Sequence, residues 1–186
     1  MSDAEVTPQA DDRRELITRA TAPYAATGCR FLQQLQVNGD AAGTIHARAS
    51  LALTEAVGRE GPPLLSPVEF LICYNQMLYG TLATIIADRL HPALASWTLD
   101  DFWQRQLPNV VIHHATTSIA EPLDARSLHG SLTIERISDR LIKRRTLLID
   151  TTVGLTDPTG RIATGSIEVA LTDSPRADAE AKNIPE

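Results

Sequence analysis

The dominant feature of the hydrophobic pattern is a stretch over residues 66–90 that is apolar on nearly every side. Ser66, followed by Pro67 and then Glu69, has the pattern of a capping box with proline at the first helical position. The residue before Pro92 is steered away from the helical conformation, which predicts the end of the helix near this point. A helix that is apolar all round must be covered on all sides, so the pattern predicts one long helix in the centre of the fold.

The same stretch is also long enough to cross a membrane, because residues 70–87 contain no charged side chain. Asn75 and Gln76 stand side by side within it, and no other segment offers a second span. The rest of the chain alternates between apolar and polar residues, which is typical of strands. We therefore expect the core helix of a protein that has no membrane-spanning segment.

Strand patterns flank this helix on both sides. A short helix is expected over residues 12–22, and the pair Thr98 and Asp101 predicts the capped start of another. The strand candidates are residues 28–37, 45–53, 109–119, 128–137, 140–155 and 162–172. Two strands, one long helix and four more strands predict an α+β protein with the hot-dog fold, in which an antiparallel β-sheet is wrapped around one long central helix.

The two ends of the chain have the composition of solvated tails. Residues 1–12 are predicted to be a disordered tail and residues 173–186 a flexible one, because both are rich in acidic and small residues. Residues 13–172 then form a single domain. A sheet wrapped around one helix leaves an open edge that must be paired, so we expect a homodimer or a larger homo-oligomer.

Charge and cysteine content exclude several classes of protein. The net charge of −6 and the lack of a basic stripe argue against a nucleic-acid partner. The first residues contain no signal-peptide pattern, which predicts a cytoplasmic protein. Cys29 and Cys73 fall in different predicted elements without metal-ligand spacing, so no metal or other cofactor is expected.

Several short sequence blocks occur in a fixed order along the chain. They are Pro23-Tyr24, Gly28-Cys29-Arg30, Val68-Glu69, Tyr74-Asn75-Gln76, Trp97-Thr98, Asp100-Asp101, Gln104-x-Gln106-Leu107, Pro122-Leu123 and Gly165-Ser166-Ile167-Glu168. Each block is common by itself, but the ordered set is specific. Across about residues 20–172 the chain resembles the FcoT-type thioesterase family of hot-dog proteins.

This resemblance implies action on acyl chains that acyl carrier protein or CoA holds as thioesters. Family members in isonitrile-lipopeptide and β-amino-acid pathways are bifunctional. They add glycine to C3 of a (2E)-enoyl thioester in a Michael addition and then hydrolyse the thioester, releasing a 3-(carboxymethylamino) fatty acid. We expect this two-step reaction here. The alternatives are a simple acyl-CoA or acyl-carrier-protein thioesterase and a scaffold that binds acyl chains without catalysis.

The chain departs from the family at two positions. Family thioesterases that act on long chains carry a tyrosine in the loop before the central helix and an asparagine at its cap, where this chain has Gly58 and Ser66. The other family tyrosine and asparagine are matched by Tyr24 and Asn75. The resemblance therefore favours the two-step role on a shorter acyl chain.

Candidate catalytic groups must act by polarisation and proton transfer, because the chain has no GxSxG elbow, no HExxH motif and no phosphate-binding glycine loop. A thioester carbonyl at the start of the central helix would meet backbone N–H groups and the positive end of the helix dipole. Ser66 is a candidate for binding substrate there. Glu69 is either the capping partner of Ser66 or a carboxylate that activates water.

Two amides and one phenol have both a structural and a functional interpretation. Burying an amide without a partner is costly, so Asn75 and Gln76 bond either to the sheet and a partner helix or to the thioester oxygen and water. Tyr24 is either a half-buried core residue or a donor to substrate.

Glycine arrives as an ammonium ion and must lose a proton before it attacks C3, and histidine titrates in the required range. His113 and His114 are neighbours on a predicted strand, so one is expected to face the helix, although a bulge would change which one. His46 is a weaker candidate for this base. Arg59 could bind the glycine carboxylate, or be an ordinary solvated side chain.

The densest basic run of the chain is formed by Lys143, Arg144 and Arg145. Acyl carrier proteins are acidic, so this run is the predicted docking surface for a carrier. The alternative is a solvated face of an ordinary hairpin strand.

Overall fold

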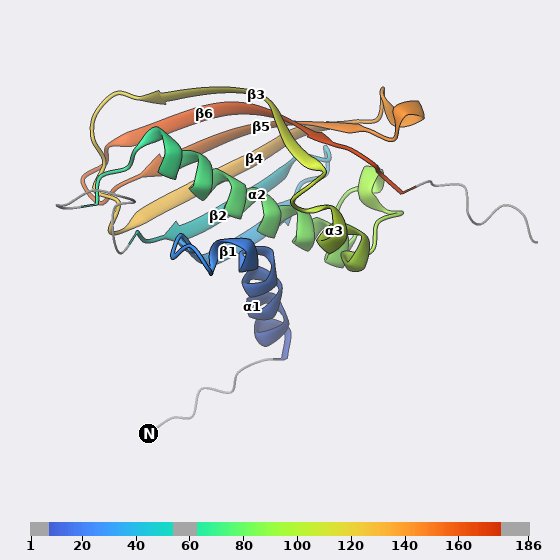
Figure 1. Cartoon of the computed structure of the whole chain (residues 1–186), viewed down its shortest axis with the longest axis horizontal. Coiled ribbons are helices and arrows are strands. Elements are labelled where there is room, and N and C mark those ends of the chain that lie inside the picture. Colours follow the sequence, from blue (N-terminus) through green and yellow to red (C-terminus); the bar gives the residue numbers. More distant parts are fainter. Residues whose placement is uncertain (1–7, 54–62, 176–186) are drawn as a thin grey trace, which may run out of the picture.

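The computed structural model of the chain describes residues 8–53 and 63–175. Its helices are α1 (Pro8–Ala20), α2 (Pro67–Asp88) and α3 (Leu99–Arg105), with single 3₁₀ turns η1 (Ala22–Tyr24), η2 (Pro92–Leu94) and η3 (Ile142–Arg144). The strands are β1 (Leu32–Gly39), β2 (Ile45–Leu51), β3 (Val110–Ile119), β4 (Leu128–Ser138), β5 (Leu147–Thr156) and β6 (Ile162–Leu171). Figure 1 shows the sheet curved around α2, with α1 and α3 beside it.

All six strands form one antiparallel sheet in the order β1-β2-β4-β5-β6-β3. The sheet therefore has two edges, β1 and β3, and α2 connects strands that lie far apart in this order. This arrangement is the hot-dog fold predicted from the sequence. We call the side of the sheet that faces α2 its inner face and the opposite side its outer face.

Helix α2 begins and ends where the local sequence dictates. Ser66 and Glu69 form the predicted capping box, and Pro67 occupies the first turn. At the other end Arg89 adopts a left-handed conformation with φ of 53°, and its backbone N–H bonds to the carbonyl oxygen of Ile85. A left-handed residue that closes the last turn in this way is a common helix stop.

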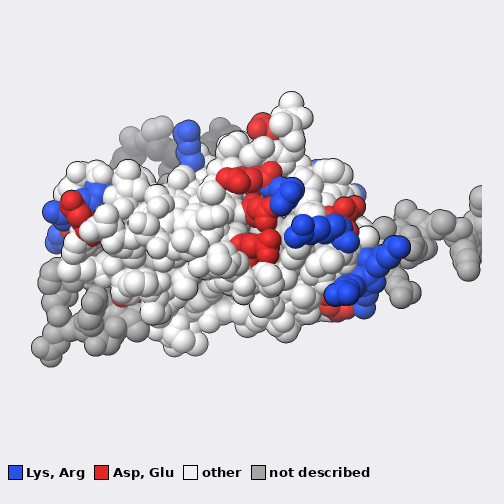
Figure 2. Space-filling model, turned by 90° about the horizontal axis from the view of Figure 1, so that it is seen from above, with Lys and Arg blue, Asp and Glu red and all other residues white. Residues whose placement is uncertain are grey.

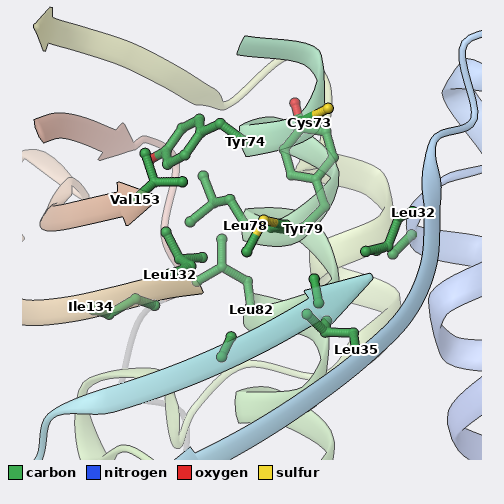
Figure 3. Close-up of a cluster of buried hydrophobic side chains, with 14 of the residues drawn as sticks. Leu32, Leu35, Cys73, Tyr74, Leu78, Tyr79, Leu82, Leu132, Ile134 and Val153 are labelled. Carbon is green, nitrogen blue, oxygen red and sulfur yellow. The ribbon is translucent and has the colours of Figure 1, made fainter. Parts of the chain in front are cut away.

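The core lies between α2 and the inner face of the sheet. Figure 3 shows Leu78 and Leu82 of α2 directed into a cluster with Leu132 of β4 and Val153 of β5. By length and hydropathy α2 could span a membrane, but 78% of its most apolar window is buried within the fold. The chain therefore covers this helix itself, as expected for a core helix.

Two glycines on the inner face let the sheet approach the helix closely. A side-chain carbon at Gly165 of β6 would lie 3.1 Å from the ring of Phe70. One at Gly130 of β4 would lie 2.7 Å from the sulfur of Met77. At these two strand positions the large side chains of the helix thus occupy the space that the side chain of any residue other than glycine would need.

The predicted elements were correct in kind and order, and the errors concern boundaries. Helix α1 begins at Pro8, so the predicted disordered tail over residues 1–12 is too long, while residues 1–7 and 176–186 lie outside the described residues. The first strand runs over Leu32–Gly39, later than predicted.

The prediction of one strand over residues 140–155 is wrong in its first part. Ser138 of β4 pairs with Leu148 of β5, so the residues between them must reverse the chain. They do so through the turn η3, which is followed by Arg145 in a left-handed conformation with φ of 55°. The pairing of β4 with β5 fixes where the hairpin must turn. Residues 140–146 therefore form the turn although their sequence pattern is that of a strand.

The side chain of Gln76 hydrogen-bonds the backbone at the start of β1 to the middle of α2. Its side-chain oxygen accepts hydrogen bonds from the backbone N–H groups of Phe31 and Leu32, both at 2.9 Å. Its side-chain nitrogen donates to the carbonyl oxygen of Cys29 at 2.7 Å. The side chain is fully buried. These bonds support the structural interpretation of Gln76 over the predicted role in substrate binding.

We predict that Gln76→Met lowers the free energy of unfolding by about 3 kcal/mol or more. It removes three hydrogen bonds and leaves buried backbone groups without partners, each of which costs about 1–3 kcal/mol. Chemical denaturation of the variant measures this change. The matched control is Gln36→Met, because Gln36 lies on β1 with an exposed side chain. Equal stability of the two variants would contradict the role assigned to Gln76.

Candidate active site

The N-terminal cap of α2 is formed by Ser66 and Glu69. The Ser66 N–H donates to the Glu69 carboxylate at 2.7 Å, and the Glu69 N–H donates to the Ser66 hydroxyl at 3.3 Å. Glu69 is almost fully buried, with 2% of its surface exposed. The capping interpretation of this pair is therefore confirmed. Because Pro67 has no N–H and the cap uses two others, the first turn offers a thioester fewer amide donors than an uncapped helix end.

A second polar group lies further along α2. Asn75 and Tyr79 are one helical turn apart, and Tyr24 approaches them from η1. The ring centroids of Tyr24 and Tyr79 are 6.4 Å apart, and the side chains of Asn75 and Tyr79 lie close enough to the Tyr24 hydroxyl to lower its pKa. Tyr24 and Asn75 are half-buried, whereas Tyr79 is buried. The structure thus brings together two of the predicted catalytic residues, which are 51 positions apart (75 − 24) in the sequence.

The environment of Tyr24 keeps its hydroxyl protonated at neutral pH. Burial raises the pKa of Tyr24 above the ordinary phenol value of 10.0, and the nearby side chains of Asn75 and Tyr79 only partly oppose this rise. A protonated phenol can donate a hydrogen bond to a carbonyl oxygen. Tyr24 can therefore act as a donor to substrate at neutral pH.

The loop that carries Tyr24 is held by short-range bonds and by Gln76. The Cys29 N–H bonds to the Tyr24 carbonyl oxygen at 3.2 Å, and Gly28 between them has φ of 69°, a conformation that favours glycine. The Cys29 carbonyl accepts the bond from Gln76 described above. Gln76 follows Asn75 on α2. It therefore helps to hold the loop that carries Tyr24 close to Asn75.

The prediction that one of His113 and His114 faces the helix is wrong. A bulge between Ile112 and His114 inserts His113 as an extra residue, and His114 pairs with Glu168. Ile167, the neighbour of Glu168, is buried on the inner face, so Glu168 and His114 point to the outer face. His113 lies on the same side, since its Nδ1 is 2.6 Å from the Glu168 carboxylate. Both histidines are exposed and lie across the sheet from α2.

The two weaker candidates do not join the site. His46 of β2 is exposed, with its ring near the Thr133 hydroxyl at 3.3 Å and the Asp40 carboxylate at 3.7 Å. These contacts belong to the outer face of the sheet and to the β1–β2 turn. Arg59, the predicted ligand of the glycine carboxylate, lies outside the described residues.

The predicted docking residues divide into two kinds. Lys143 and Arg144 are exposed on the turn η3. Arg145 instead bonds to the Asp173 carboxylate at 2.6 Å and to the Ser174 carbonyl at 3.1 Å. It therefore anchors the segment after β6, which reduces the exposed basic run to two residues.

A shallow hollow of about 500 Å³ lies on the outer face of the sheet. Its walls are mainly hydroxyl side chains, among them Thr116, Ser131, Thr152 and Ser166. Figure 2 shows an uncharged area on this side of the molecule, with charged side chains at both ends and to one side of its centre. None of the predicted catalytic residues lines this hollow, so its size alone does not make it the active site.

The described part of the chain has no cluster of potential metal ligands, and its buried cysteine is not placed to act as a nucleophile. No group of three or more histidine, cysteine or acidic side chains there could hold a metal ion. Cys73 is fully buried, and burial raises the pKa of its thiol, which therefore stays protonated.

Tyr79 was not selected from the sequence. The available signal was its spacing of four residues from Asn75, which places both on the same side of a helix. Within an apolar helix a tyrosine at that spacing has the pattern of an ordinary core residue. Only the packing of the Tyr24 ring against it, seen in the structure, distinguishes Tyr79 from an ordinary core residue.

Comparison with known proteins identifies one family model and relatives that share the same name. A family model described as the FcoT-like thioesterase domain matches residues 19–171. A protein of Mycobacterium marinum named (2E)-enoyl-[ACP] glycyltransferase is 25% identical over 163 residues, which cover 87% of each chain. A protein of the same name from Streptomyces coeruleorubidus is 30% identical over 125 residues, covering 67% of this chain and 74% of that protein.

Solved structures share the fold at low sequence identity. A sigma28-regulated virulence protein from Campylobacter jejuni matches with a TM-score of 0.51 and 12% identity, over 93% of this chain and 97% of its own. A candidate thioesterase from Syntrophus aciditrophicus matches with a TM-score of 0.50 and 7% identity, over 87% and 99% of the two chains. The structural likeness supports the hot-dog fold, and the family match spans nearly the whole described domain. This chain belongs to the FcoT-like thioesterase family.

Proposed function

We propose that this protein is a cytoplasmic enzyme that adds glycine to C3 of a (2E)-enoyl thioester on an acyl carrier protein and then hydrolyses the thioester. The observation that carries the proposal is that Tyr24 packs against Tyr79, one helical turn from Asn75, so that two half-buried polar side chains, Tyr24 and Asn75, gather at an otherwise apolar helix. The names of the M. marinum and S. coeruleorubidus relatives support the choice of reaction.

Both steps of this reaction place negative charge on the same oxygen. In the first step the glycine nitrogen forms a bond to C3, the thioester becomes an enolate, and C2 then takes up a proton. In the second step water attacks the carbonyl carbon, the C–S bond breaks, and the carrier thiol leaves with a proton. Donors aimed at the thioester oxygen stabilise both the enolate and the tetrahedral intermediate, so one pair serves the two reactions.

Glycine must also lose a proton before it attacks, and His113 and His114 lie across the sheet from α2. We propose that Glu69 acts as this base in addition to accepting the capping bond from the Ser66 N–H. It lies six residues before Asn75, which corresponds to about 9 Å along a helix. A carboxylate in that place is suited to removing a proton from the amine or from water.

The test is a thiol-release assay on a crotonyl thioester with and without glycine. The proposed reaction requires release that depends on glycine and a secondary amine in the product. Release at the same rate without glycine would instead identify a simple thioesterase. The absence of release in both conditions would identify a scaffold that binds acyl chains.

In this assay we expect Asn75→Ala and Tyr24→Phe each to slow glycine addition and hydrolysis by about a hundredfold, the usual loss for one donor to an oxyanion. The controls are His113→Ala and His114→Ala, which should retain wild-type rates because both side chains lie on the outer face. Each half-reaction is measured separately with pre-aminated thioester for the second step. Slow addition in a histidine control would contradict the assignment.

We further propose that the enzyme is a homodimer built by pairing of β3 with its copy. Strand β3 ends the sheet, and Ala115 and Thr117, which pair with inner-face residues of β6, are exposed. On α2 the neighbouring side chains Val68 and Leu71 are exposed and half-buried, respectively. A second copy would extend the sheet and cover this apolar surface.

Light scattering of the wild-type protein at micromolar concentration should give twice the mass of the chain. We expect Val68→Asp to shift the equilibrium toward monomer, because a charge would be buried in the interface. Ile162→Asp is the control, since Ile162 is equally apolar and 54% exposed on β6. A monomeric wild-type protein would contradict the proposed interface.

We also propose that the carrier protein docks at the turn η3 through Lys143 and Arg144. Ile142 beside them is 47% exposed. An apolar cleft of about 320 Å³ lies next to it, lined in part by Trp97 and Leu147. Figure 2 shows basic side chains at the end of the molecule where this turn lies. Cations beside an apolar cleft suit an acidic partner that also presents an apolar side chain.

The double variant Lys143→Glu/Arg144→Glu should raise the KM for a carrier-bound substrate by about tenfold or more, while the KM for a short pantetheine thioester stays unchanged. The control Arg14→Glu/Arg48→Glu makes the same change of net charge at exposed positions of α1 and β2. An equal response of the two substrates would rule out docking at this turn.

A further inference from the structure

The loop that carries Tyr24 is tied to its surroundings at both ends by buried glutamine side chains. Gln76 of α2 donates to the carbonyl oxygen of Cys29 at 2.7 Å, as described above. At the other end, the side-chain nitrogen of Gln106, the residue that follows α3, donates to the carbonyl oxygen of Ala20 at 2.5 Å. Gln106 is buried, with 4% of its surface exposed, and it has no part in the reaction proposed above.

The bond to Ala20 is made at the residue where α1 ends. In a helix that continued, the carbonyl oxygen of Ala20 would accept the N–H of residue 24, four positions later. Here Pro23 interrupts the helix, and the Tyr24 N–H bonds instead to the carbonyl oxygen of Thr21 at 3.0 Å. The Gln106 amide thus takes the place that the backbone of Tyr24 would occupy.

The position of Gln106 is itself fixed by α3. Thr98 and Asp101 form a capping box at the start of this helix, and Phe102 within it is fully buried. Arg105, next to Gln106, bonds to the Asp101 carboxylate at 3.1 Å. The amide therefore approaches the end of α1 from a separate and well-anchored element, which lies beside α2 (Figure 1).

The place of the Tyr24 ring depends on the path of the backbone after Ala20. The ring packs against that of Tyr79 on α2, with the centroids 6.4 Å apart. Without the Gln106 amide, the carbonyl of Ala20 would lose its partner in a buried place, which is costly. The Tyr24 N–H is the donor that an α-helix would supply in its stead. That exchange would rewind residues 21–24 and move the ring away from Tyr79.

We propose that Gln106 is a positioning residue that holds Tyr24 in the place from which its phenol reaches the thioester oxygen of the substrate. This inference rests on the proposed function for the identity of the substrate. Gln106 itself does not touch the substrate, because it acts through the backbone of residues 20–24. Together with Gln76 it fixes both ends of the Tyr24 loop on helices that belong to other parts of the sequence.

Two substitutions provide matched controls for Gln106→Met. Gln104 lies on α3 with an exposed side chain, so Gln104→Met makes the same chemical change without the loss of a buried bond. Thr151 is buried in the core, where its hydroxyl lies 2.9 Å from the Tyr74 hydroxyl and donates to a backbone carbonyl of β6 at 2.8 Å. Thr151→Val therefore loses buried hydrogen bonds, as Gln106→Met does, but away from the loop.

In the kinetic test we expect Gln106→Met to lower kcat for thioester hydrolysis by about tenfold with KM unchanged, because even a small displacement of a catalytic group slows the reaction. Gln104→Met and Thr151→Val should keep the wild-type kcat. The double variant Tyr24→Phe/Gln106→Met should be no slower than Tyr24→Phe, because Gln106 acts only through Tyr24.

Three kinetic results would overturn the proposal. They are a wild-type kcat in Gln106→Met, a further loss of activity in the double variant, and an equal loss in Thr151→Val, which would show a general effect of lost stability. Should Gln106→Met fail to fold, Gln106→Asn replaces it in every measurement, because its amide is one methylene shorter and stops short of the Ala20 carbonyl oxygen.

A spectroscopic test does not depend on activity. The chain contains three tyrosines, so protein labelled with ¹³C at the phenol carbon gives three resonances, and Tyr24→Phe identifies the one from Tyr24. We expect Gln106→Met to shift the Tyr24 resonance, whereas Gln104→Met leaves it unchanged. Thr151→Val should leave it unchanged as well and shift that of Tyr74, its hydrogen-bond partner.

The two measurements separate this inference from the proposed function. An unshifted Tyr24 resonance in Gln106→Met would refute the positioning role even in an active enzyme. A wild-type protein that does not hydrolyse thioesters would refute the proposed function, while a shift of the Tyr24 resonance in Gln106→Met would still support the effect of Gln106 on the place of Tyr24.

Discussion

The fold depends on the need to cover a helix that is apolar on nearly every side. Helix α2 cannot expose its surface to water, and the curved sheet encloses most of it. Close contact requires glycine at Gly130 and Gly165, where the strands pass beneath Met77 and Phe70. The hydrophobic effect thus determines both the curvature of the sheet and the positions at which its strands carry no side chain.

The polar side chains of α2 are informative because burial makes an unpaired polar group costly. Gln76 satisfies backbone groups at the start of β1, and Tyr74 bonds to Thr151 in the core. Asn75 and Tyr79 instead meet Tyr24. Two of these groups therefore tie the helix to the sheet, and the other two lie beside the half-buried ring of Tyr24. This division separates structural from chemical roles within one helix.

The same structure excludes chemistry that the residue types alone allowed. His113 and His114 are the residue type that the base requires, but with the bulge in β3 both lie on the outer face, where His113 contacts Glu168. Arg145 has the charge of a docking residue, but it holds Asp173. His113 and Arg145 thus each contact a carboxylate from a distant part of the sequence, a pairing that the residue types alone do not reveal.

The sequence by itself determined the hot-dog fold, the cap of α2 and the family, because these depend on local periodicity, capping chemistry and the order of short motifs. It also named Tyr24 and Asn75, through the resemblance to known relatives. Only the tertiary structure decided that these two residues meet, that Tyr79 joins them and that Gln76 supports their loop. It also decided the direction of His113, which one inserted residue in β3 reverses. Such features depend on strand register and on contacts between residues far apart in the chain, and neither is encoded in the alternation of apolar and polar positions.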